Sequence, residues 1–210
     1  ESIDYWCEYY IENGSLAQNI SSNILDWSKR YKIAFGMARV LAYFHEQCLE
    51  WILHCDIKTQ NILLDSNYDP KLADFGLSKL LNKNNPNNPS IFVIRGPRGY
   101  TAPEWVPITS KVDIYSYGIV VLEMLTGKSP TTSIQDSNGK ETYDGKLVAC
   151  VREKKSNTNT SWVVQIIDPG IGPNYDKSKM EILTTVALNC VTEDRFKAHH
   201  ESSSRDASMS

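Results

Sequence analysis

Two polar segments stand close together in the sequence: His54-Cys55-Asp56-Ile57-Lys58-Thr59-Gln60-Asn61 and Asp74-Phe75-Gly76. Between them, two short apolar runs, residues 62–64 and 71–73, flank the turn-forming residues 65–70. Apolar runs on either side of such a turn predict a β-hairpin. We therefore expect a hairpin that holds the two polar segments side by side at one end.

The side chains of these segments suit phosphoryl transfer, a reaction that depends on positioning and charge neutralisation. Asp56 can orient an attacking hydroxyl, and Lys58 can meet the transferring phosphate. Asn61 and Asp74 supply amide and carboxylate oxygens, which are ligands suited to Mg2+. The sequence therefore predicts these four residues as catalytic, with Asn61 and Asp74 also as metal ligands. The alternative is that all four are unrelated loop residues.

The order of the motifs resembles the signature of protein kinases, in which a catalytic loop precedes D-F-G and then A-P-E. The corresponding segments here are H-C-D-I-x-x-x-N at residues 54–61, D-F-G at residues 74–76, and Ala102-Pro103-Glu104. A lysine two residues after Asp56 resembles the serine/threonine class rather than the tyrosine class.

Other segments resemble plant receptor-like kinases, and the residues before the catalytic aspartate look most like the S-domain (G-type lectin) branch. These segments are residues 12–16, 41–46, 102–105 and 110–118, with Trp51-Ile52-Leu53-His54-Cys55-Asp56 for the branch. The resemblance covers roughly residues 7–198. It implies a mainly α (α+β) fold like the helical C-terminal lobe of a kinase, with a small β-hairpin that carries both loops.

The resemblance also implies how Mg-ATP would be held. The first residues would form the hinge between kinase lobes, where the backbones of Glu8 and Tyr10 would meet the adenine edge. Leu63 would form the floor beneath adenine, and Lys58, Asn61 and Asp74 would bind the nucleotide. The alternative for the hinge is a frayed terminal strand.

The glycine-rich loop and the V-A-I-K lysine of kinases are not found in the sequence. We therefore expect residues 1–198 to be a partial kinase domain, the hinge plus the C-lobe, that lacks the N-lobe. Residues 199–210 contain few apolar side chains, which predicts a disordered, divergent tail. We expect this chain alone to be weakly active or inactive.

Three residues depart from the family pattern. Cys55 replaces the arginine that usually precedes the catalytic aspartate, so the chain resembles the non-RD kinases; packing is the favoured role of its thiol over reactivity. Pro97 occupies the place of a threonine that in the family bonds the aspartate and lysine of the catalytic loop, and this puts peptide alignment in doubt. Thr59 stands where relatives often have proline, and we expect little effect.

The rest of the chain predicts helices. Asp26 is a candidate N-cap for a helix over residues 27–47, and residues 111–126 are apolar nearly all round, as in a buried helix that Gly127 would end. By resemblance, Asp113 in that helix would hold the backbone of the loop at His54; the alternative is a first-turn acid that interacts with the helix dipole. We expect shorter helices at residues 145–154 and 178–192, and a loop at residues 128–144.

Composition limits the binding partners and the cellular compartment that the sequence predicts. The net charge of −3 does not indicate nucleic-acid binding, and five scattered cysteines without a C-x-x-C pair favour a reducing compartment. No apolar run is long enough to span a bilayer, so we expect no membrane segment in the chain. By resemblance the location would be the cytosolic side of the plasma membrane, and this chain alone would be cytoplasmic.

The leading hypothesis is a serine/threonine protein kinase domain that transfers the γ-phosphoryl of ATP to protein substrates in receptor-like signalling. The alternative is a non-catalytic kinase-lobe module that binds partners or substrates of full-length receptor-like kinases. A third possibility is an incomplete product without a stable fold.

Overall fold

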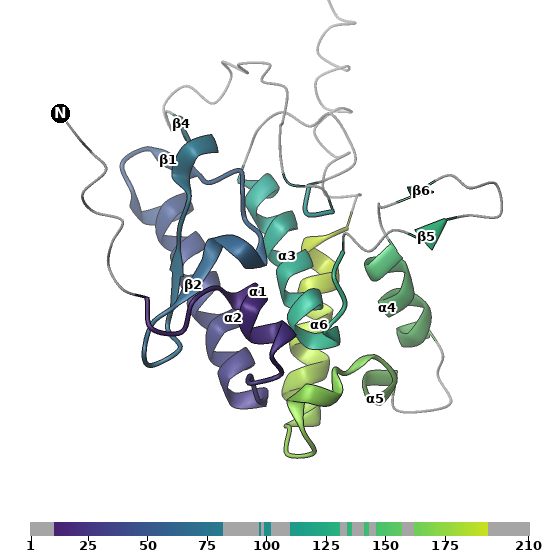
Figure 1. Ribbon diagram of the computed structural model, residues 1–210. Coiled ribbons are helices and arrows are strands. Elements are labelled where there is room, and N and C mark those ends of the chain that lie inside the picture. The colour runs from purple at the N-terminus through teal and green to yellow at the C-terminus, as the bar shows by residue number, and fades with distance from the viewer. Residues whose placement is uncertain are drawn as a thin grey trace, which may run out of the picture.

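The computed structural model describes residues 11–81, 97, 99–101, 110–130, 134–135, 141–142, 146–156 and 162–192. Helices make up most of these residues, and the strands among them form three separate two-stranded antiparallel sheets (Figure 1). The predicted fold class, mainly α with a small β-hairpin, is confirmed.

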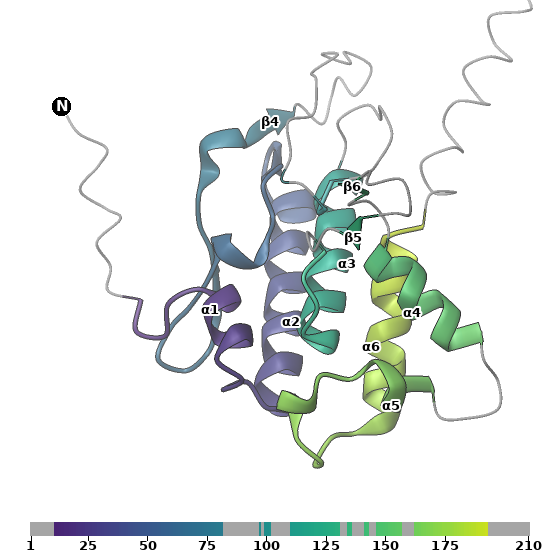
Figure 2. The ribbon, with the colours of Figure 1, turned by 45° about the vertical axis from the view of Figure 1, so that its right-hand side comes forward.

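Three helices form the centre of the molecule: α2 (Trp27–Ala42), α3 (Lys111–Thr126) and α6 (Lys177–Cys190). Figure 2 shows α3 between the other two, and it contacts both. Nearly every residue of α3 is buried, as its apolar composition predicts. Gly127 ends the helix with a φ of 65°, a left-handed conformation that glycine adopts without a steric cost. The predicted bounds of this helix are confirmed.

Helix α2 begins as predicted, because the Asp26 side chain accepts a hydrogen bond from the backbone N–H of Lys29 at 2.9 Å. Its apolar stripe, which includes Ile33, Met37 and Leu41, is buried in the core. The predicted helix over residues 27–47 is confirmed, but its last turn widens into a π-helix at Tyr43–Gln47.

The predicted hairpin consists of β2 (Ile62–Leu64) and β3 (Pro70–Leu72), paired antiparallel with Ile62 opposite Leu72. Its second strand therefore begins one residue earlier than the predicted run. A second pair, which the sequence did not predict, joins β1 (Trp51–Leu53) to β4 (Lys79–Leu81).

These two strand pairs fix both ends of the polar loops. The first loop runs from β1 to β2, and the second runs from β3 to β4. Because β1 pairs with β4 and β2 pairs with β3, each loop is held against the other at its beginning and at its end. A further hydrogen bond, from the N–H of Ala73 to the carbonyl of Asn61 at 2.9 Å, joins the loops directly.

The remaining elements surround this centre. The predicted helices at residues 145–154 and 178–192 correspond, within two residues at each end, to α4 (Lys146–Ser156) and α6. The predicted loop at residues 128–144 is wrong in part, because it contains the two-residue strands β5 (Ile134–Gln135) and β6 (Glu141–Thr142). The sequence also did not predict α1 (Leu16–Ser21) or α5 (Trp162–Ile166). Within the described ranges, no helix is both long and apolar enough to cross a membrane.

Candidate active site

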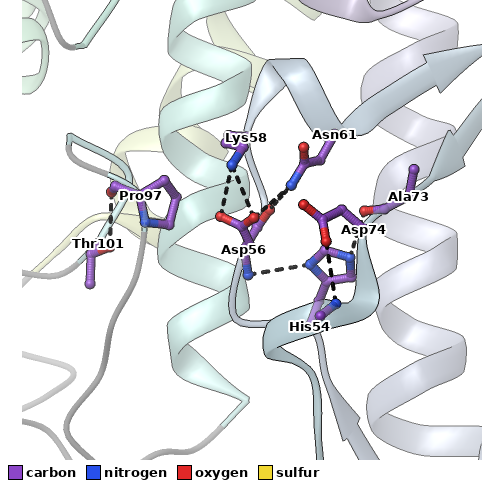
Figure 3. Close-up of polar contacts among 9 residues, drawn as sticks. His54, Asp56, Lys58, Asn61, Ala73, Asp74, Pro97 and Thr101 are labelled. Atoms are coloured by element: carbon purple, nitrogen blue, oxygen red, sulfur yellow. Dashed lines mark hydrogen bonds and ion pairs between the residues drawn. The ribbon is translucent and has the colours of Figure 1, made fainter.

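The two loops bring together the four side chains that the sequence predicted as catalytic. Asp56, Lys58 and Asn61 come from the loop between β1 and β2, and Asp74 comes from the loop between β3 and β4 (Figure 3). Lys58 directly precedes a 3-10 turn at Thr59–Asn61, and Asp74 directly precedes a second one at Phe75–Leu77. Local turns therefore set the direction of each side chain.

Asp56 is the most strongly held of these side chains and is only 5% exposed. The Lys58 ammonium donates to both carboxylate oxygens, at 3.2 Å to Oδ1 and 3.0 Å to Oδ2. The Asn61 amide donates to Oδ2 at 2.8 Å and to the backbone carbonyl of Asp56 at 2.9 Å. Oδ2 thus accepts two of these bonds and Oδ1 accepts one. Since each carboxylate oxygen has about two acceptor sites, Oδ1 retains capacity for a further donor.

Asp74 is exposed and has a left-handed backbone, with a φ of 62°. Its Oδ1 accepts a hydrogen bond from the N–H of Gly76 at 3.3 Å. The Asn61 amide nitrogen is directed at Asp56, and Figure 3 shows its oxygen on the side away from that carboxylate. Carboxylate and amide oxygens of this kind remain suited to a hard cation.

These two oxygen donors fit Mg2+ better than a metal that needs a complete protein cage. Mg2+ usually keeps several waters and binds one or two protein groups together with substrate phosphates. In the described part of the chain, no group of three or more His, Cys, Asp or Glu side chains is arranged to hold a metal ion. Asn61 and Asp74 would be the two protein groups at such a site.

His54 has a structural role in the first loop. Its Nε2 donates to the carbonyl of Ala73 at 3.0 Å, and its Nδ1 accepts from the N–H of Asp56 at 3.3 Å. The ring also packs against Phe75, with centroids 4.8 Å apart. Burial lowers the pKa of His54, which favours the neutral imidazole that this pattern of one donor and one acceptor requires. His54 therefore ties Asp56 to the second loop.

Asp113, in the first turn of α3, binds the backbone of the first loop. Its Oδ2 accepts from the N–H of His54 at 2.9 Å, and its Oδ1 accepts from the N–H of Cys55 at 2.9 Å. His45, in the π-helical turn, lies with Nε2 3.1 Å from Oδ2. The predicted role of Asp113 is confirmed, whereas the part of His45 was missed. The resemblance named the loop backbone as the partner of Asp113 but did not name His45.

Cys55 has the packing role that the sequence favoured. Its side chain is buried, and this burial raises the pKa of the thiol to about 11. A thiol of that kind holds little of the reactive thiolate near neutral pH. Its φ of 62° is unusual for a residue other than glycine and helps to turn the loop between His54 and Asp56.

Pro97 and Thr59, two of the residues that depart from the family pattern, make different contacts. The carbonyl of Pro97 accepts from the N–H of Tyr100 at 3.1 Å and from the Thr101 hydroxyl at 3.0 Å, and Figure 3 shows Pro97 apart from the Asp56–Lys58 pair. Thr59 was expected to have little effect. It is fully buried, and its hydroxyl lies 3.2 Å from the hydroxyl of Tyr100.

The other predicted residues divide into two groups. Leu63 lies half-buried in β2, opposite Lys71. Glu8 and Tyr10, predicted to contact adenine, lie outside the described residues, as do residues 102–104 and the predicted tail at residues 199–210.

Comparison with known proteins agrees with this geometry. The protein kinase domain family matches residues 4–204. A relative from Zea mays, ZmPK1, whose name describes a receptor protein kinase, is 42% identical over 195 residues, which make up 90% of this chain and 24% of the relative.

Two relatives from Arabidopsis thaliana are about half identical. The G-type lectin S-receptor-like serine/threonine-protein kinase At5g24080 is 50% identical over 127 residues, 57% of this chain and 14% of its own length. The LRR receptor-like serine/threonine-protein kinase RGI5 is 51% identical over 189 residues, 87% of this chain and 17% of its own length. The chain thus spans about a quarter or less of the length of these relatives. The predicted resemblance to plant receptor-like serine/threonine kinases is confirmed, and the chain belongs to the protein kinase domain family.

Proposed function

We propose that this chain carries the catalytic loop with which a protein kinase domain transfers the γ-phosphoryl group of ATP, in complex with Mg2+, to serine and threonine hydroxyls of protein substrates, and that the chain alone does so weakly. The family assignment supports the reaction class. The observation that supports the proposal is the hydrogen bonding of Asp56. Lys58 and Asn61 fix its carboxylate, and Oδ1 can still accept a further hydrogen bond.

In this proposal, the substrate hydroxyl donates its hydrogen bond to Asp56 Oδ1, which orients the hydroxyl oxygen for attack. Lys58 is 26% exposed at its side chain, so its ammonium can contact a phosphoryl oxygen and the carboxylate at the same time. Asn61 keeps Oδ2 in place during this step because it donates to both Oδ2 and the backbone. The chain thus contributes positioning and charge, which are the main requirements of phosphoryl transfer.

Asn61 and Asp74 are the residues that would hold the metal. When bound, Mg2+ neutralises the negative charge of the phosphates during transfer. Leu63 would form the floor beneath adenine, and the backbones of Glu8 and Tyr10 would meet its edge. By likeness to relatives named as receptor kinases, the setting is the cytosolic side of the plasma membrane.

The test of this proposal is transfer from radiolabelled ATP to a peptide library containing serine and threonine. Asp56→Asn should lower the rate about 100-fold or more, because it removes the group that orients and deprotonates the hydroxyl. Asp69→Asn is the matched control, since Asp69 is a surface carboxylate paired with Lys32 at 3.0 Å. A rate that survives Asp56→Asn unchanged would show that the transfer does not use this site.

A second candidate function is a non-catalytic module that binds partners of full-length receptor-like kinases. The observation in its favour is a set of exposed apolar side chains in the second loop and in β4: Phe75, Leu77 and Leu80, at 46%, 42% and 65% exposure. This function predicts that a full-length receptor-like kinase binds wild-type chain and Asp56→Ala equally well, with no transfer by either. Binding that needs Asp56 would argue against it.

A further inference from the structure

A buried line of hydroxyl and carboxyl groups leads away from the catalytic loop. Thr59 follows Lys58 directly, and its Oγ1 lies 3.2 Å from the Tyr100 hydroxyl. That hydroxyl donates to Glu123 Oε2 at 2.5 Å, so its single proton is committed to Glu123. The Tyr100 oxygen can therefore accept the proton of Thr59, whose side chain also interacts with Glu123. Thr59 and Tyr100 thus form one buried cluster with Glu123 on α3.

Tyr100 is in turn fixed at two points by the most buried helix of the molecule. The Ser116 hydroxyl donates to the backbone carbonyl of Tyr100 at 2.8 Å, and Glu123 accepts a hydrogen bond from the side-chain hydroxyl of Tyr100. Ser116 and Glu123 are seven residues apart, which is about two turns along one face of a helix. Tyr100 is therefore a rigid reference point, since both groups that hold it belong to α3.

Thr59 is placed so that any shift of its backbone moves both donors to Asp56. The turn Thr59–Asn61 is closed by a hydrogen bond from the N–H of Asn61 to the carbonyl of Lys58 at 3.0 Å. Lys58 and Asn61 are the two residues that hold the Asp56 carboxylate. Thr59 lies between them, inside the turn, and is fully buried.

We propose that the Thr59 hydroxyl is a positioning group for phosphoryl transfer, which anchors the catalytic loop to Tyr100 and thereby to α3. This inference rests on the proposed function, and it assigns to Thr59 a role that its place in the sequence did not suggest. Thr59 does not contact the reacting atoms. It acts by keeping Lys58 and Asn61 in register with residues 99–101, so that Asp56 presents Oδ1 in a constant direction.

Four variants separate this role from simple core packing. Thr59→Val keeps the shape of the side chain and removes only the hydroxyl, whereas Thr59→Ser keeps the hydroxyl. Tyr100→Phe removes the same hydrogen bond from the other side. Thr184→Val is the matched control, because Thr184 is also fully buried and its hydroxyl donates to the carbonyl of Met180 within α6.

The first measurement is amide hydrogen exchange at pH 8, which is above the pKa of about 7 that burial gives Glu123. The reporters are the N–H groups of Asn61 and Tyr100, which donate to Lys58 and Pro97. Thr59→Val should speed exchange at both reporters about 2- to 10-fold, the range for one neutral hydrogen bond. Tyr100→Phe should speed it at least as much, because it also removes the bond to Glu123. Thr59→Ser should stay near wild type, and Thr184→Val should leave both reporters unchanged. A Tyr100 amide that does not respond to Thr59→Val would overturn the proposal.

The second measurement is steady-state kinetics with a serine peptide. Thr59→Val should lower kcat about 2- to 10-fold and leave the KM for Mg-ATP unchanged, with rescue by Thr59→Ser. The losses of the double variant Thr59→Val/Tyr100→Phe should be less than the product of the single losses, because both single variants remove the Thr59–Tyr100 bond and Tyr100→Phe also removes the bond to Glu123. Multiplied losses would overturn the proposal. If transfer proves independent of Asp56, the proposed function fails, and the exchange result alone decides whether the anchor exists.

Discussion

Asp113 is the side chain on which the shape of the catalytic loop most depends. It is fully buried, and its two oxygens accept from the backbone N–H groups of His54 and Cys55 while His45 lies against Oδ2. A carboxylate that accepts several hydrogen bonds offsets the cost of its own burial. The loop is thus fixed by one side chain from the first turn of α3.

Replacement of Asp113 should therefore destabilise the whole chain. Asp113→Ala leaves two buried backbone N–H groups without their acceptor, at a cost of about 1–3 kcal/mol each. We expect the free energy of unfolding in urea to fall by about 2–6 kcal/mol. Asp113→Asn, which keeps one acceptor oxygen, should lose less. A loss below about 1 kcal/mol for Asp113→Ala would show that the loop is held by other contacts.

Glu123 makes stability depend on pH in a defined window. Burial raises the pKa of its carboxyl from the ordinary 4.5 to about 7, although the bond from Tyr100 opposes the shift. Between these values the folded chain binds more protons than the unfolded chain. Its contribution to stability is therefore full below pH 4.5 and is lost as the pH rises through 7.

The variant Glu123→Gln isolates this contribution, because it keeps an acceptor for Tyr100 and does not titrate. The difference in unfolding free energy, wild type minus variant, should fall by up to about 3 kcal/mol between pH 4.5 and pH 8. Urea titrations at several pH values measure it. A difference that stays constant across this window would mean that Glu123 is already ionised at low pH.

The sequence predicted which side chains lie together at the candidate site but missed two groups behind it, Thr59 and Tyr100. Asp56, Asn61 and Asp74 stand at fixed spacings, and the structure brings them together. Thr59 and Tyr100 are 41 residues apart, and Tyr100 and Glu123 are 23 residues apart. No local pattern connects such residues, because their contact depends on how the helices and loops pack.

Helix α3 packs against α6 so closely that one position between them admits only glycine. A Cβ atom added at Gly118 would lie 2.8 Å from Cβ of Cys190, 2.8 Å from Cγ1 of Val191 and 2.9 Å from the carbonyl of Ala187. The carbonyl belongs to the helix backbone and cannot move aside by a change of rotamer. Close approach of the two helices therefore requires Gly118.

Gly118→Ala should destabilise the chain even though alanine favours helix formation by about 1 kcal/mol. Overpacking in a core costs about 1–3 kcal/mol, and a clash with backbone belongs at the upper end of that range. We expect a net loss of about 1–2 kcal/mol in urea unfolding. The control Val186→Ala, on the exposed side of α6, should change stability by about 0.5 kcal/mol or less. A more stable Gly118→Ala variant would contradict the packing described here.

Long helices were predictable and short strands were not. Residues 111–126 carry an apolar pattern over four turns, and the observed α3 has the predicted bounds. Strands β1 and β4 have three residues each, too few for an alternating pattern to stand out. Their pairing also joins residues on either side of the hairpin β2–β3. That pairing joins the beginning of the first loop to the end of the second loop.

In the molecule as a whole, the helical core and the two polar loops have separate roles. The buried helices α2, α3 and α6 form the core, and the strand pairs hold two polar loops beside the first turn of α3 (Figure 1). Each loop is fixed at both ends, so the positions of Asp56, Asn61 and Asp74 follow from the fold rather than from a bound ligand. Such a preformed arrangement reduces the ordering cost when a nucleotide binds.

Asn61 and Asp74 would form the metal side of a nucleotide site, and thermal unfolding with and without Mg-ATP is the experiment that decides this assignment. Asp74→Asn is a fair variant, because asparagine also tolerates the left-handed backbone at this position. Mg-ATP at about 100 times its Kd should stabilise the wild type by about 2.7 kcal/mol and the variant far less. Equal stabilisation of both proteins, or none of the wild type, would show that Asn61 and Asp74 do not hold the metal of a bound nucleotide.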